Sequence, residues 1–152
     1  MYFCGKLTSG TGSSDYKLVA FDNALISAGI SNYNLLKVSS ILPKGCREGQ
    51  QIGPIEGSAL LVAYASIASN LPGDLIASSV AVGIPEKSDQ VGVIMECSGH
   101  YNAETAEKTA REMVRIAMEN HGIPCKEIKS SSAEATVSDD GFSSVISALA
   151  MW

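Results

Sequence analysis

Apolar residues recur along the chain with two spacings, one typical of helices and the other of strands. A short amphipathic helix is predicted over residues 21–29, because four apolar residues fall on one helical face: Phe21, Ala24, Leu25 and Ala28. A longer helix is predicted from Asn102, a good N-cap residue, to His121, just before Gly122 and Pro124. Its apolar face is expected to contain Ala106, Ala110, Met113 and Ala117.

The other apolar segments are rich in small and β-branched residues and are predicted to be strands. They span residues 2–7, 34–42, 58–69, 75–84, 91–97, 126–137 and 142–152. The Ala-rich run 58–69 is also compatible with a helix. Residues 8–15 (TSGTGSSD) are interpreted as a polar turn, because they match no phosphate-binding glycine motif, and residues 44–57 as a polar loop. Without repeats or linkers, residues 1–152 are expected to form one α+β domain.

Composition narrows the possible functions. The chain has 152 residues, 45% of them hydrophobic, which suits a single buried core. Its net charge of −5 and its lack of a Lys/Arg cluster argue against nucleic acid as a partner. The longest apolar run, 59–68, is too short to span a membrane, and the N-terminus does not resemble a signal peptide. We therefore expect a cytoplasmic protein with no membrane partner.

Reactive side chains are few. The four cysteines are scattered without a CxxC spacing, which favours free thiols, and with only two histidines beside them no metal site is expected. A G-x-S-x-G nucleophile motif is absent, so a serine hydrolase is difficult to build. His100 and His121 are interpreted as residues at the ends of a strand and a helix.

Several longer segments carry a family resemblance. In order, they are AFDNALISAGISNYNLLKVSSILP (20–43), the Gly57-Ser58-Ala59 start, PGDLIASSVAVGIPEK (72–87), GVIMECSGH (92–100), AEKTAREM (106–113), AEATV (133–137) and SALAMW (147–152). In this order and spacing they resemble the pyruvoyl-dependent arginine decarboxylases over nearly the whole chain. The family pattern differs at Lys44, where a second proline is usual, and at Ser31 and Tyr33, where glycine and a smaller apolar residue are expected.

The resemblance implies that the chain cleaves itself between Ser39 and Ser40 into chains 1–39 and 40–152. The Ser40 hydroxyl would attack the preceding carbonyl, and elimination followed by hydrolysis would leave a covalent pyruvoyl cofactor in place of Ser40. That group forms a Schiff base with the substrate amine and accepts the electrons released as CO2 leaves. The implied reaction converts L-arginine to agmatine.

The same resemblance assigns roles to three further residues. Asn34 corresponds to an asparagine that assists cleavage, and its amide would stabilise the oxyanion of the acyl shift. Glu96 corresponds to the acid that protonates the decarboxylated intermediate. Asp22 corresponds to the carboxylate that holds the substrate guanidinium in a bidentate contact.

Without the resemblance, each residue has an ordinary interpretation. Ser39 and Ser40 would be strand serines, Asp22 an acid near a helix N-terminus, and Asn34 a turn residue. Glu96 would be a solvated strand end, although a carboxylate after VGVIM risks burial and a raised pKa.

For the architecture, the resemblance implies a four-layer α-β-β-α sandwich, assembled as a homotrimer or a dimer of trimers with interfacial active sites. Two other functions stay open. One is the same fold and cofactor acting on another amino acid, such as histidine. The other is an uncleaved, non-enzymatic oligomerisation or binding domain.

Overall fold

The computed structural model describes residues 3–152, so Tyr2 of the first predicted strand lies outside the described residues. The described chain contains two helices and nine strands. In order they are β1 (Cys4–Ser14), α1 (Lys17–Ala28), β2 (Asn34–Lys37), β3 (Ile41–Leu42), β4 (Arg47–Glu48), β5 (Ala59–Ser69), β6 (Leu75–Pro85), β7 (Gly92–Gly99), α2 (Ala103–Asn120), β8 (Cys125–Thr136) and β9 (Phe142–Met151). No helix in this part of the chain is long and apolar enough to cross a membrane.

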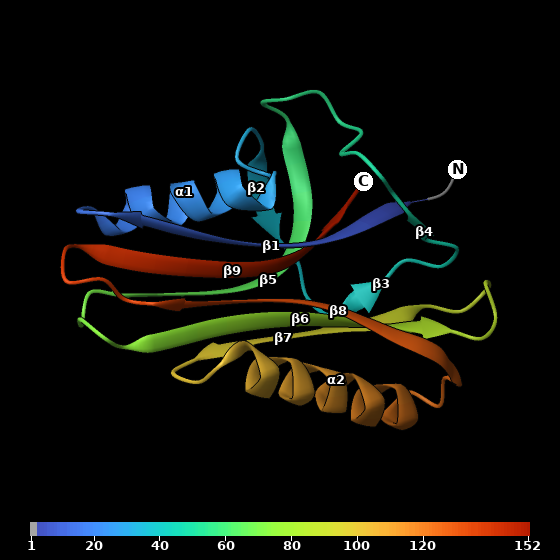
Figure 1. Ribbon diagram of the computed structural model, residues 1–152. Coiled ribbons are helices and arrows are strands. Elements are labelled where there is room, and N and C mark those ends of the chain that lie inside the picture. The colour runs from blue at the N-terminus through green and yellow to red at the C-terminus, as the bar shows by residue number, and fades with distance from the viewer. Residues whose placement is uncertain (1–2) are drawn as a thin grey trace.

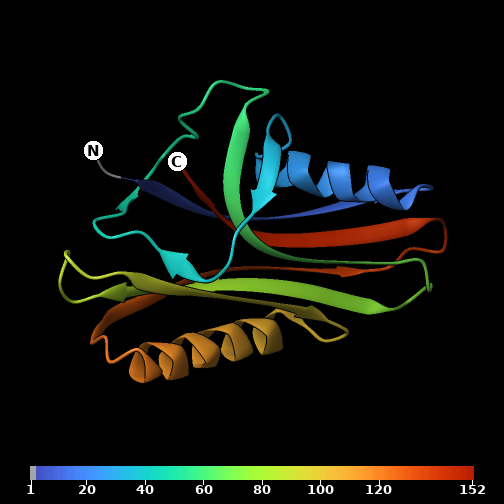
Figure 2. The same cartoon turned by 180° about the vertical axis from the view of Figure 1, so that it is seen from behind.

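The strands form two sheets that face each other (Figure 1). The first sheet has the order β2-β5-β9-β1-β4, and the second has the order β3-β7-β6-β8. Helix α1 covers the outer face of the first sheet and α2 covers the outer face of the second (Figures 1 and 2). The expectation of a single α+β domain with four α-β-β-α layers is confirmed.

Apolar side chains fill the three spaces between these layers, because successive strand residues point to opposite faces of a sheet. Between α1 and the first sheet lie Ala24, Leu25, Ala28, Ile30, Leu60, Val62, Ile146, Ala148 and Ala150. Between the sheets lie Leu42, Ala63, Val80, Val82, Ile94, Leu149 and Met151, with a second cluster of Ile76, Val137 and Val145. Between α2 and the second sheet lie Ala81, Val93, Ala110, Val114 and Met118. Alternation along the strands therefore distributes the buried strand side chains among these spaces.

The prediction of a turn at residues 8–15 was wrong, because β1 continues through most of them to Ser14. Its glycines are not turn residues. A Cβ atom on Gly10 would lie 2.3 Å from the carbonyl oxygen of Ala24, and one on Gly12 would lie 2.3 Å from the Ala24 nitrogen. Glycine in β1 thus lets the backbone of α1 approach the sheet closely.

Three other boundaries differ from the sequence prediction. Helix α1 begins at Lys17 rather than Phe21, so Asp22 lies in its second turn and not at its N-terminus. The predicted strand 34–42 is divided into β2 and β3. Asn102 caps α2, and its side-chain oxygen accepts a hydrogen bond from the Thr105 amide at 2.8 Å. The third and fourth residues of the buried row on α2 lie one position later than predicted. It contains Ala106, Ala110, Val114 and Met118, since residues four apart lie above one another on a helix.

The polar loop 44–57 is confirmed except for the two-residue strand β4. Its glycines make room for the indole of Trp152. A Cβ atom on Gly49 would lie 2.5 Å from this ring, and one on Gly53 would lie 2.6 Å from its nitrogen. The backbone of Trp152 is held by two hydrogen bonds to Cys4, of 2.7 and 3.0 Å. The loop that follows Ser40 is thereby packed against the end of β9.

Candidate active site

Residues 38–40 pass from the first sheet to the second (Figure 2). The Val38 amide donates to the Val62 carbonyl of β5 at 3.0 Å, and the Ser40 carbonyl accepts from the Ile94 amide of β7 at 2.7 Å. Ser39 is exposed and Ser40 is half-buried. The Ser39–Ser40 peptide bond therefore lies between two anchored residues and belongs to neither sheet.

Glu96 lies close to this crossing segment. It is two residues beyond Ile94 on β7, so its side chain points to the same side as Ile94, into the space between the sheets. Ser98 continues this row and donates to the Ser66 carbonyl of β5 at 3.3 Å. Since Ile94 binds Ser40, the chain positions Glu96 beside residues 38–40.

The environment of Glu96 suits an acid catalyst. Burial raises the pKa of its carboxyl group, and the charge of Lys37 opposes that increase. The Glu96 Oε2 atom is buried and has no hydrogen-bond partner within residues 3–152. A carboxyl group of raised pKa with an uncommitted oxygen can hold a proton and deliver it to a reacting atom.

Sequence reasoning missed Lys37 and its neighbour Tyr64. The Lys37 Nζ atom lies 4.7 Å from the centroid of the Tyr64 ring, within cation–π range. The other contact of this ring is Phe21 of α1, at 6.4 Å between centroids. Lys37 interrupts the apolar run NLLKV, and such a charge inside the predicted strand 34–42 was the signal available in the sequence.

Asn34 lies apart from the bond it was expected to serve. Its side-chain amide donates to the Gly57 carbonyl at 2.9 Å, and its backbone amide donates to the Ser58 carbonyl at 2.9 Å. It precedes Ser39 by five residues along an extended segment, which corresponds to roughly 16 Å. Within one chain, Asn34 joins β2 to the end of the 44–57 loop, and its role in cleavage stays a prediction.

Asp22 lies on the exposed side of α1 and makes no side-chain hydrogen bond or ion pair within the described residues. Leu18 and Ile26, one turn before and after it, share its side of the helix and are 78% and 57% exposed. The carboxylate thus lies in the middle of an exposed apolar row. The described chain does not bring Asp22 into contact with Ser40 or Glu96.

A shallow recess of about 580 Å³ separates the start of α1 from the free edge of β5. Phe21 and Tyr64 line it, which places it between the helix of Asp22 and the Lys37 side chain. Ser144 forms part of its floor, and the buried Ser144 hydroxyl has no hydrogen-bond partner within residues 3–152.

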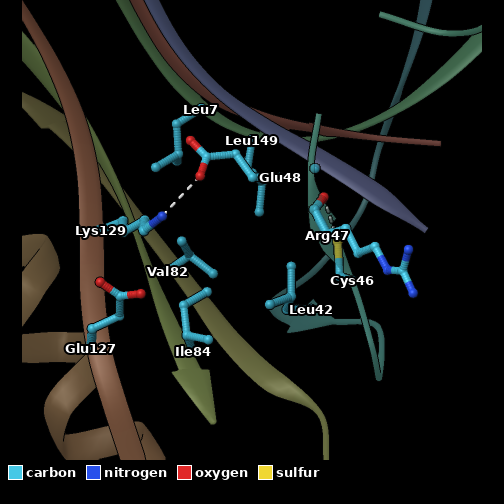
Figure 3. A pocket seen from close by; sticks show the side chains of 11 residues that line it. Leu7, Leu42, Cys46, Arg47, Glu48, Val82, Ile84, Glu127, Lys129 and Leu149 are labelled. Atoms are coloured by element: carbon cyan, nitrogen blue, oxygen red, sulfur yellow. Dashed lines mark hydrogen bonds and ion pairs between the residues drawn. The ribbon is translucent and has the colours of Figure 1, made fainter. Parts of the chain in front are cut away.

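A smaller pocket of about 180 Å³ opens at another edge of the sandwich, where β4 meets β8 (Figure 3). The Lys129–Glu48 ion pair, at 3.0 Å, forms part of its lining, together with aliphatic side chains such as Leu7, Val82 and Leu149. Burial, followed by the proximity of Cys4, raises the pKa of the Cys46 thiol in this pocket to about 11. The thiol therefore stays protonated near neutral pH and is a poor nucleophile. Among the residues that line this pocket, Leu42 is the one close in sequence to the predicted site, two residues after Ser40.

Comparison with known proteins shows the family of this chain. Residues 5–152 match the family described as pyruvoyl-dependent arginine decarboxylase. A protein of that name from Methanocaldococcus jannaschii is 37% identical over 150 residues, which cover 96% of this chain and 87% of the relative. Relatives of the same name from Thermococcus kodakarensis and Pyrococcus abyssi are 39% and 41% identical, over 90% and 81% of this chain and 85% and 78% of their own lengths. The chain therefore belongs to the family of pyruvoyl-dependent arginine decarboxylases.

Proposed function

We propose that this protein cleaves itself between Ser39 and Ser40 and then decarboxylates L-arginine to agmatine and CO2. The observation that carries the proposal is the position of the half-buried Glu96, whose buried Oε2 atom has no hydrogen-bond partner within residues 3–152, beside a serine pair that crosses between the sheets. Family membership supplies the cofactor class and the substrate that the relatives' names specify. The residues present fit a pyruvoyl group, because Ser40 provides its carbon skeleton and Glu96 an acid next to it.

In the cleavage step, the Ser40 hydroxyl attacks the Ser39 carbonyl and the peptide nitrogen leaves, which gives an ester. Elimination transfers the ester oxygen to Ser39 as a carboxylate and leaves dehydroalanine at position 40. Water then releases ammonia and leaves the pyruvoyl group. The hydrogen bonds of Val38 and Ser40 to the two sheets favour these steps. They hold both residues in place while the peptide between them makes no sheet hydrogen bond.

The mature site divides its tasks among the chain's own residues. The pyruvoyl carbonyl supplies an electron sink for the carbon–carbon bond cleavage. Glu96 holds a proton and delivers it to the substrate α-carbon, and the apolar space between the sheets keeps water from that carbon.

Asp22 is proposed to bind the guanidinium group across a subunit boundary. Leu18 and Ile26 flank it with exposed apolar surface, which a neighbouring subunit would bury. A homotrimer or dimer of trimers would thereby bring Asp22 of one subunit to the Ser40 and Glu96 of the next. The four cysteines are unpaired, which suits a reducing compartment, and we place the protein in the cytoplasm.

Asp22 distinguishes arginine from histidine, the alternative substrate. Asp22→Asn removes the charge that pairs with a guanidinium and is expected to raise the KM for arginine at least tenfold, a loss typical for a charged hydrogen bond. Glu104→Gln on α2 is a matched control, because its carboxylate pairs with Lys108 on the surface. An unchanged KM in Asp22→Asn would show that Asp22 does not bind the guanidinium group.

Tyr33, which departs from the family pattern, has a hydrogen-bond partner of its own. Its hydroxyl donates to the Pro54 carbonyl at 3.0 Å.

The proposal is tested by intact mass spectrometry under denaturing conditions, together with agmatine formation from arginine. Wild-type protein should give two chains that divide after Ser39, and Ser40→Ala should give one inactive chain. Ser39→Ala is the control, since it keeps the attacking hydroxyl and should still divide. A wild-type chain that stays whole after prolonged incubation would instead support the uncleaved binding domain.

A further inference from the structure

The pocket between β4 and β8 has the size and the lining of a small-molecule site. Its volume of about 180 Å³ exceeds the roughly 150 Å³ of an aliphatic cavity that takes up a benzene-sized molecule. Leu42, Val82 and Leu149 are buried side chains of its lining, and Leu7 and Ile84 pack against the same apolar cluster. Such a lining favours a ligand with a short aliphatic chain.

Four charged side chains belong to the same lining, and one carboxylate among them has no ion-pair partner. Lys129 of β8 pairs with Glu48 of β4 at 3.0 Å, which joins the edges of the two sheets. The guanidinium group of Arg47 points away from the other labelled side chains (Figure 3). Glu127 makes no ion pair and no side-chain hydrogen bond within residues 3–152. The lining therefore offers one negative charge to a ligand.

The strand register places this carboxylate beside the aliphatic part of the lining. Glu127 lies opposite Ile84 in the β6–β8 ladder, and Lys129 lies opposite Val82, so these four side chains share the face of the second sheet that is turned toward the first. The hydrogen bond and charge of Glu48, and after them the charge of Glu127, raise the pKa of Lys129. One lysine thus serves two carboxylates, and a second cation beside Glu127 would balance them.

We propose that this pocket binds a primary aliphatic amine in its ammonium form, with the alkyl chain among the aliphatic side chains and the ammonium group on Glu127. An alkylamine, like a lysine side chain, is protonated near neutral pH and donates a charge-assisted hydrogen bond to a carboxylate. A ligand with a carboxylate head would instead be repelled by Glu127. The proposed site is separate from Ser40 and Glu96, and it does not depend on the reaction assigned to them.

The test is isothermal titration calorimetry with n-hexylammonium, n-hexanol and n-hexanoate, on Ser40→Ala protein because that chain cannot form a ketone that reacts with the amine. We expect saturable binding of n-hexylammonium, about threefold or more tighter than that of the other two. Glu127→Gln should remove this preference, whereas Glu134→Gln, exposed on the same strand and outside the lining, should keep it. Equal binding of the three ligands, or an unchanged preference in Glu127→Gln, would overturn the proposal.

Two further measurements locate the ligand. Cys46 belongs to the lining, so saturating n-hexylammonium should slow its reaction with iodoacetamide, whereas Cys125, outside the lining, should react at an unchanged rate. A Cβ atom on Gly5 would lie 3.2 Å from the Cys46 Sγ atom and 3.5 Å from the Leu149 Cδ1 atom. Gly5→Ala therefore narrows the pocket and should weaken n-hexylammonium more than n-butylammonium. Should Gly5→Ala not fold, protection of Cys46 decides, and a Cys46 that reacts equally fast with and without the amine refutes the proposal.

Discussion

The contact between β1 and α1 gives a prediction that links the fold to the site. A Cβ atom on Gly12 would lie 2.3 Å from the Ala24 nitrogen and 2.5 Å from the Ala20 carbonyl oxygen, whereas ordinary contacts begin at 3.4 Å. Both atoms belong to the helix backbone and cannot rotate away. Gly12→Ala therefore requires α1 to withdraw by roughly 1 Å, at a cost near the upper end of overpacking effects, about 3 kcal/mol.

For a chain of this length, that loss corresponds to a melting temperature lower by roughly 6–12 °C. The measurement uses a Ser40→Ala background, so that every sample is one uncleaved chain, and compares Gly12→Ala with Ser13→Ala. Ser13 is exposed on the same strand and should melt like the parent. In the cleavable protein, Gly12→Ala should also raise the KM for arginine, because the displaced helix carries Asp22. A melting temperature within two degrees of the parent would refute the proposed tight packing of this helix on glycine.

Three further predictions concern buried polar groups. Ser144→Ala should leave stability unchanged or raise it, because the Ser144 hydroxyl is buried without a partner in residues 3–152. Ser147→Ala should instead cost about 1–3 kcal/mol, because the Ser78 hydroxyl loses its partner at 2.8 Å. Denaturant unfolding measures both variants, and the reverse order of stability would contradict the prediction. Glu96→Gln should leave cleavage intact but slow decarboxylation, and normal turnover of this variant would exclude Glu96 as the acid catalyst. In the wild type, kcat should fall only as the pH rises through the pKa of Glu96, which burial raises. Cys46 should react with iodoacetamide more slowly in the folded than in the unfolded protein, as burial raises its pKa to about 11, and equal rates by peptide mass spectrometry would count against that environment.

Hydrophobic patterning was sufficient for most of the fold, because long periodic segments such as α2 and the strands β5 to β9 bury one or both faces. It failed at residues 8–15, where the local composition is typical of a turn but the segment is a strand. The reason is tertiary: β1 is rich in glycine since α1 packs directly on its backbone, and that contact cannot be inferred from the segment itself.

The site was predictable only in part for a similar reason. The resemblance predicted roles for Ser40 and Glu96, but their proximity depends on the hydrogen bond that joins Ser40 to Ile94 across the sheet edge. Lys37 was overlooked because the sequence does not show that its charge acts on the Glu96 carboxyl group. Asp22 and Asn34 have no contact with the serine pair within the described chain, so their predicted roles depend on the assembly proposed above.

The crossing between the sheets would also let the fold tolerate the proposed cut at this position. Chain 1–39 would keep β1, which pairs with β9 from Gly5 opposite Met151 to Ser14 opposite Phe142, and would keep β2 on β5. Val38 would remain bonded to the first sheet and Ser40 to the second, so cleavage breaks no ladder hydrogen bond. A cut inside any long strand would leave paired backbone groups without partners, at about 1–3 kcal/mol for each buried group. The peptide bond whose cleavage would free Ser40 for cofactor formation is therefore also one that can be broken at little cost to the stability of the fold.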